Sequence, residues 1–74
     1  MARMRLVKRK LVVGFLLSKG FTPAGMRGSH EKFVHPDGRR TTVLNYKELW
    51  KKPIGWILED INATWEELEK FLNE

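Results

Sequence analysis

The sequence contains no cysteine, and this absence removes two common ways of stabilising a small protein. Without thiols the chain cannot form disulfide bonds, and it cannot build the thiolate zinc sites that hold many small domains together. The absence also fits a reducing compartment, so we expect a cytoplasmic location. We expect the 74 residues to form one domain with an apolar core of modest size.

The sequence also lacks a long hydrophobic run. Its longest apolar-rich stretch, residues 11–17, is much shorter than the roughly 20 residues that a membrane-spanning helix needs. The basic start and this stretch together are similar to a signal peptide, but no small-residue cleavage site follows. Cleavage would also remove a core element, so we expect neither a signal peptide nor membrane association.

Acidic residues are scarce in most of the chain. Residues 1–58 hold 13 lysines and arginines against 3 acidic residues, a balance of +10. Residues 59–74 hold 1 against 6, a balance of −5. A basic body with an acidic end predicts a polyanionic partner on one side of the molecule. A soluble surface with a chance division of charge has the same composition, so both interpretations stay open.

The first predicted element is a helix at residues 8–19, which follows a loose basic arm at residues 1–7. Hydrophobicity alone fits a buried strand equally well, but Lys19 and Gly20 are typical of the end of a helix. Gly14 is expected to allow close packing on a sheet. The apolar residues predicted to face the core are Val12, Phe15 and Leu16, with Val13 and Leu17 beside them.

Three strands are predicted next, at residues 21–27, 31–35 and 41–45. Pro36-Asp37-Gly38 indicates a tight turn between the second and third strands, because proline fixes its own φ and glycine accepts a positive one. We therefore expect an α+β fold, with a three-stranded antiparallel meander, helices on one face and a partly solvated opposite face.

Two helices are predicted after the strands and a connector at residues 46–52. Pro53 suits the first position of one helix, whose predicted core stripe is Ile54, Ile57, Leu58 and Ile61. Asn62-Ala63 ends it, and Thr64 with Glu67 has the spacing of a capping box. The buried face of the last helix is predicted to be Trp65, Leu68 and Leu72, and Trp56 is expected to be exposed.

Residues 26–40 contain side chains suited to chemistry on a phosphodiester. His30 follows Gly28-Ser29, and histidine changes charge near neutral pH, with a reference pKa of about 6.5. RNA supplies its own nucleophile, the 2′-hydroxyl, so cleavage needs a base and positive charge but no metal ion. A lone histidine at the start of a strand is nonetheless more often structural, and by themselves the residues favour that interpretation.

The sequence resembles the HicA-type mRNA interferase toxins of prokaryotic toxin–antitoxin pairs. The resemblance is carried by Gly20-Phe21, Arg27-Gly28-Ser29-His30, Phe33 and His35-Pro36-Asp37-Gly38-Arg39, and it covers roughly residues 9–72. It implies a fold similar to a double-stranded-RNA-binding domain, here spanning residues 8–74. It also implies a metal-independent endoribonuclease that cuts mRNA and is blocked by a HicB-type antitoxin.

With this resemblance, His30 becomes the expected general base. The expected RNA-binding residues are Arg27, Gly28, Ser29, Lys32, Arg39, Arg40 and Lys47. His35 is interpreted as structural, steadying the turn, because strand residues five apart point to opposite faces. The histidines and acidic residues match no metal-ligand spacing, and we expect no metal or other cofactor.

The sequence departs from the family pattern in two places. Leu44-Asn45-Tyr46 stands where many members have a proline and a histidine, and Pro53-Ile54-Gly55 replaces a common glycine-threonine-leucine. The alternative function is therefore a non-catalytic RNA-binding module of the same fold, such as a phage could encode. A third hypothesis is a protein-interaction domain that uses its tryptophans and acidic last helix.

Overall fold

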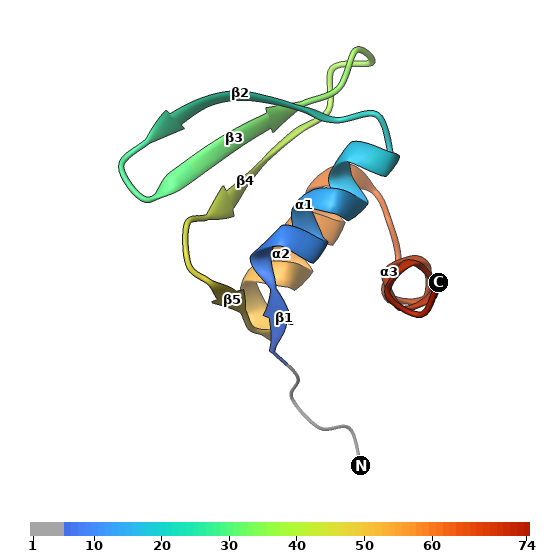
Figure 1. Cartoon of the computed structure of the whole chain (residues 1–74). Helices are drawn as coiled ribbons and strands as arrows, with labels where there is room; N and C mark the ends of the chain where they lie inside the picture. The colour runs from blue at the N-terminus through green and yellow to red at the C-terminus, as the bar shows by residue number, and fades with distance from the viewer. Residues whose placement is uncertain (1–5) are drawn as a thin grey trace.

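The computed structural model describes residues 6–74, which form three helices and two small antiparallel sheets (Figure 1). The elements are β1 (Val7–Lys8), α1 (Arg9–Ser18), β2 (Thr22–Arg27), β3 (His30–Val34), β4 (Arg40–Leu44), β5 (Glu48–Leu49), α2 (Lys51–Ile61) and α3 (Trp65–Leu72). The larger sheet has the order β2-β3-β4, and the smaller one pairs β1 with β5. The first five residues of the predicted arm lie outside the described part of the chain.

The larger sheet buries one face and leaves the other in solvent. Phe33 of β3 and Val43 of β4 are almost completely buried, whereas Lys32 and Thr42, their neighbours along the strands, are exposed. Helices α1 and α2 lie on the same side of this sheet (Figure 1). The α+β prediction is confirmed, and the arrangement is consistent with a fold like that of double-stranded-RNA-binding domains.

The small sheet is an element that hydrophobic patterning did not predict. Val7 pairs with Leu49, both residues are buried, and the Arg9 amide donates to the Lys47 carbonyl at 2.9 Å. The sequence pattern predicts only a loose arm at residues 1–7 and a plain connector at residues 46–52. A two-residue pair has too little pattern to detect, yet here it fastens the start of α1 to the segment before α2.

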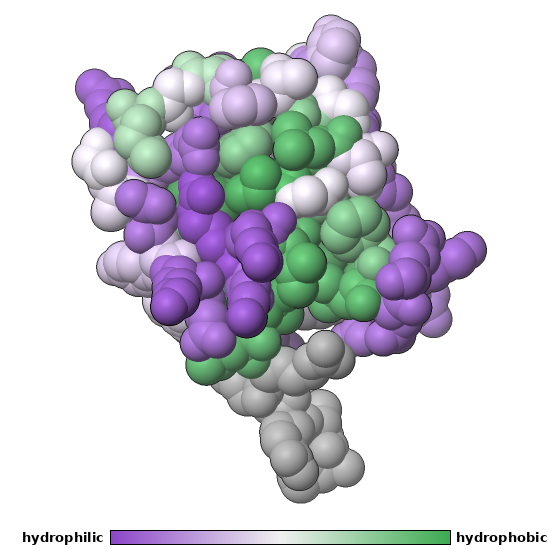
Figure 2. Space-filling model, viewed as in Figure 1, coloured by the Kyte–Doolittle hydropathy of each residue, from purple (hydrophilic) through white to green (hydrophobic). Residues whose placement is uncertain are grey.

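Helix α1 ends as predicted, but its outer side differs from the prediction. Gly20 has a φ of +94°, and the Phe21 amide donates to the Leu16 carbonyl at 3.0 Å, which is the bond pattern of a glycine-terminated helix. Leu17 is half exposed, and the surface over α1 is largely hydrophobic (Figure 2). Gly14 faces the Phe71 ring of α3 instead of the sheet.

The core stripe of α2 is confirmed, because all four predicted residues are buried. Pro53 is the third residue of α2, not the first, since the helix begins at Lys51. This is tolerated because the first four amides of a helix have no intrahelical partner. The predicted helix break is also confirmed, with Asn62 left-handed at a φ of +60°.

Helix α3 begins as predicted but packs differently. Thr64 caps it, accepting a 3.2 Å hydrogen bond from the Glu67 amide. The predicted burial of Trp65 is wrong, since this side chain is 40% exposed. Phe71 instead packs edge-on against Phe15, with ring centroids 5.5 Å apart. This contact orients α3 so that Trp65 lies at the edge of the buried face of the helix.

The turn between β3 and β4 is held by a small set of polar contacts, as the interpretation of His35 anticipated. The Asp37 amide donates to His35 Nδ1 at 3.0 Å, and the Asp37 carboxylate accepts from the amide and guanidinium of Arg39. Arg39 also donates to the Ile61 carbonyl and lies over the Phe21 ring. The turn is therefore joined to the end of α2.

A matched pair of glycine substitutions tests the backbone of this turn. Gly38 has a φ of +101°, so Gly38→Ala should destabilise the domain by about 1–2 kcal/mol. Gly14→Ala adds the same methyl group in a helix, at an ordinary 3.5 Å from Phe71, and should stabilise by about 0.5–1 kcal/mol. Urea unfolding of both variants provides the measurement. Equal shifts of the two midpoints would contradict the assigned conformation of Gly38.

The stability of the domain at acidic pH should also depend on this turn, through the carboxyl group of Asp37. The hydrogen bond from the Arg39 amide, assisted by the Arg39 guanidinium, holds the pKa of Asp37 below its ordinary 3.8. A carboxylate with a lowered folded-state pKa stabilises the fold above its unfolded pKa, and this contribution disappears as pH falls through the folded value. Arg39→Ala keeps the amide, so NMR titration should show a pKa for Asp37 that rises only part of the way. A complete return to 3.8 would assign the shift to the guanidinium.

Candidate functional site

The candidate site lies on the face of the larger sheet that no helix covers. Arg27 of β2 pairs with His30 of β3, and Gly25 pairs with Lys32, which in turn pairs with Thr42 of β4. Residues paired in this way point to the same side of a sheet. The site is therefore formed by two adjacent rows of side chains that cross neighbouring strands.

These side chains line a shallow groove of about 500 Å³. Its lining residues are Ala24, Gly25, Met26, Arg27, His30, Lys32 and Thr42. This set contains two cations and one histidine but no carboxylate, so the groove attracts anions. The sequence pattern gives no signal for Met26 or Thr42 as site residues, and only the strand register brings Thr42 to the site.

A two-residue turn places His30 at the start of β3. Gly28 has a φ of +59° and Ser29 does not have a positive φ, which matches the type II′ turn favoured in hairpins. A Cβ atom added to Gly28 would meet nothing within 4 Å, so the outside of the turn is open. The glycine thus serves the hairpin geometry, and the space beside it is accessible to a ligand.

The residue opposite His30 is Leu44, the first position at which the sequence departs from the family pattern. The next amide, that of Asn45, donates to the Ser29 carbonyl at 2.7 Å and closes the end of the sheet. Leu44 is half-buried, and its side chain can neither donate nor accept a proton.

An ion pair supports this end of the sheet from the side of α1. Arg9 donates through Nε to the Leu44 carbonyl at 3.0 Å and forms a salt bridge with Glu31, the residue after His30. The side chains of Arg9 and Glu31 are both largely buried, at 20% and 23% exposure. The pair holds the ends of β3 and β4 against the first turn of α1. The spacing of Arg9 and Glu31 in the sequence does not predict this ion pair.

The remaining predicted RNA-binding residues lie outside the groove. Arg39 is held by Asp37 and the Ile61 carbonyl at the turn between β3 and β4. Arg40 is exposed opposite Val34, four residues along β3 from His30 and hence about 13 Å away. Lys47 is exposed in the loop before β5. The structure thus gathers Arg27, His30 and Lys32, with Gly28 and Ser29 beside them.

Within residues 6–74 no three histidine, cysteine or acidic side chains are placed to hold a metal ion. No described helix has the length and apolar character required to cross a bilayer.

Comparison with known proteins identifies a family that matches most of the chain. The model of a family described as the HicA toxin of bacterial toxin–antitoxin matches residues 9–62. No curated protein and no solved structure matches the chain. The matched segment contains the three strands that contribute residues to the candidate groove and the turns that position them. Because it covers well over half of the 74 residues, the chain belongs to the HicA toxin family of bacterial toxin–antitoxin systems.

Proposed function

We propose that this protein is a metal-independent endoribonuclease that cuts mRNA in the cytoplasm and is inhibited by a HicB-type antitoxin. The observation that carries the proposal is His30 in a cation-lined groove on the open face of the sheet, in a chain of the HicA toxin family. An exposed groove on a sheet can receive a single RNA strand without any rearrangement of the core.

His30 is the proposed general base. It accepts the proton of an RNA 2′-hydroxyl as that oxygen attacks the adjacent phosphorus. The bond from phosphorus to the 5′-oxygen breaks, and this oxygen takes a proton from water or from Lys32, which lies on the same face of β3. The products are a 2′,3′-cyclic phosphate and a 5′-hydroxyl. The base must be unprotonated to act, so the rate should rise with pH.

Arg27 and Lys32 are the proposed partners of the scissile phosphate. They flank His30 from two strands, and both contribute to the groove. Fixed cations at this point stabilise the negative charge that builds up on the phosphorus oxygens during attack. Arg40 lies about 13 Å along the sheet and would bind a phosphate further along the same RNA strand.

A second candidate function is RNA binding without cleavage. It is favoured by one observation: the residue paired with His30 across the strands is Leu44, whose side chain can neither donate nor accept a proton. In that case the groove and its cations bind RNA, while His30 lacks the proton donor that the leaving oxygen needs. The two candidates differ in cleavage but not in affinity, so one pair of histidine variants separates them.

The two histidines provide that matched pair. His30→Ala should lower the rate of RNA cleavage by about 10²- to 10⁴-fold, because it removes proton transfer but few phosphate contacts. His35→Gln, which alters the histidine of the turn, should retain cleavage at temperatures where the variant is folded. Cleavage of labelled RNA in EDTA, with analysis of the 3′ ends, gives the measurement. Equal RNA binding by parent and His30→Ala without cleavage by either would leave the binding module as the function.

A matched pair of arginines tests where RNA binds. Arg27→Ala should reduce the slope of log K against log salt concentration by about 0.7, the value for one lost contact to single-stranded nucleic acid. Arg39→Ala should leave the slope nearly unchanged and lower stability instead, because this arginine is held by Asp37 and Ile61. Titration of labelled RNA at several salt concentrations measures both. If Arg39→Ala reduced the slope and Arg27→Ala did not, RNA would bind at the turn between β3 and β4 instead of in the groove.

A further inference from the structure

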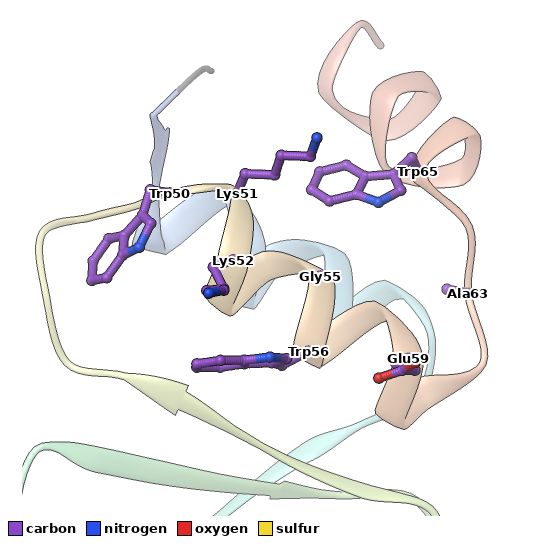
Figure 3. Close-up of a pocket in the computed structure, with 8 residues that line it drawn as sticks. All are labelled: Trp50, Lys51, Lys52, Gly55, Trp56, Glu59, Ala63 and Trp65. Carbon is purple, nitrogen blue, oxygen red and sulfur yellow. The ribbon is translucent and has the colours of Figure 1, made fainter. Parts of the chain in front are cut away.

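The three tryptophans of the chain line one groove beside α2. Trp50, Trp56 and Trp65 are 37%, 57% and 40% exposed, and they line a groove of about 750 Å³ along α2. In Figure 3, Trp65 and Trp56 lie on opposite sides of α2, with Gly55 between them. So much exposed aromatic surface on so small a domain indicates an interface with another protein surface.

Helix α2 has a second stripe in addition to its core stripe. Lys52, Gly55, Trp56 and Glu59 follow the spacing i, i+3, i+4, i+7, and all of them line the groove. The absence of a side chain at Gly55 matters here, because an added Cβ would lie 3.8 Å from the Trp65 ring. The indole of Trp65 therefore packs against α2 at Gly55.

The charges of α2 are placed against its own dipole. The first turn carries Lys51 and Lys52 and no acidic residue, and the last turn carries Glu59 and Asp60 and no basic residue. A helix has partial positive charge at its N-terminus and partial negative charge at its C-terminus, so both pairs are unfavourably placed in an isolated domain. A neighbouring antiparallel helix would offset this penalty, because its C-terminal end would lie beside the lysines and its N-terminal end beside the acidic residues.

These charges are also symmetric about the centre of the stripe. Lys52 and Glu59 are equidistant from the midpoint between Gly55 and Trp56. When two copies of a helix pair antiparallel about a two-fold axis, residues equidistant from the axis face each other. Lys52 of each copy would then face Glu59 of the other, with the tryptophans packed between. The stripe is therefore complementary to itself in charge.

We propose that two copies of this protein associate through the tryptophan groove of α2, as a symmetric antiparallel dimer. The proposal is independent of the ribonuclease function, and the grooves that contain His30 stay open on the two outer faces. A standard interface buries about 800 Å² per partner, which is about one seventh of the 5316 Å² surface of this chain. An 11-residue helix is only about 16 Å long, so we expect reversible association with a Kd on the order of micromolar.

Charge reversal within the stripe tests the proposal on the full chain. Sedimentation velocity of the parent protein should show a species of twice the monomer mass that dissociates on dilution. Lys52→Glu and Glu59→Lys should each weaken this association by at least about tenfold, because like charges then face each other. An equimolar mixture of the two variants should dimerise again, because each reversed residue then meets an opposite charge. Lys70→Glu, on α3 and outside the groove, is the control and should dimerise as the parent does.

The folding of the variants provides the second measurement. Both reversals agree with the helix dipole, so the monomers should be as stable as the parent domain or more stable in urea unfolding. Loss of association together with retained stability cannot result from damage to the fold. A parent protein that stays monomeric would overturn the proposal, and the groove would then belong to a different partner. A dimer that persists in both variants, or a mixture that fails to associate, would equally exclude this pairing.

Discussion

The structure depends on the burial of one face of a three-stranded sheet against α1 and α2. Phe33 and Val43 point into the core, and successive residues of a strand point to opposite faces. Because these two side chains are fixed in the core, the side chains of His30, Lys32 and Thr42 must point to the opposite, solvated face of the sheet. The apolar residues that hold the domain together thus also determine that the cations and the histidine share a solvated surface, where they meet any ligand without crossing the core.

The sequence was sufficient for the parts of the fold in which a pattern repeats. The stripe of α2, the glycine that ends α1 and the Pro36-Asp37-Gly38 turn each have a strong local cause, and the structure agrees with them. It was insufficient where the cause is tertiary. The β1–β5 pair has only two residues on each strand, too few for a pattern to be recognised. The orientation of α3 depends on a ring contact between Phe71 and Phe15, and the spacing of residues in the sequence does not predict this contact.

The candidate site also has parts that a local sequence motif predicts and parts that only tertiary structure determines. His30 and the turn before it were identified from a local motif, and strand alternation explains why Lys32 accompanies it. The two arginines of Arg39-Arg40 looked equivalent in the sequence, but Arg39 is engaged at the turn and Arg40 is exposed along the sheet. The support from Arg9 and Glu31 joins residues 22 apart in the chain, and only the folded structure brings them together.

The contacts of His35 have a consequence for how the domain responds to protons. Its Nδ1 atom lies 3.0 Å from the Asp37 amide, which can donate to it, and 2.9 Å from an Asp37 carboxylate oxygen, which can accept from it. A neutral imidazole is bound by the first group and a protonated one by the second. The turn therefore keeps a hydrogen bond in either state of this histidine. The end of the sheet at Gly38 and Arg39 therefore does not depend on one charge state of His35 for its hydrogen bond.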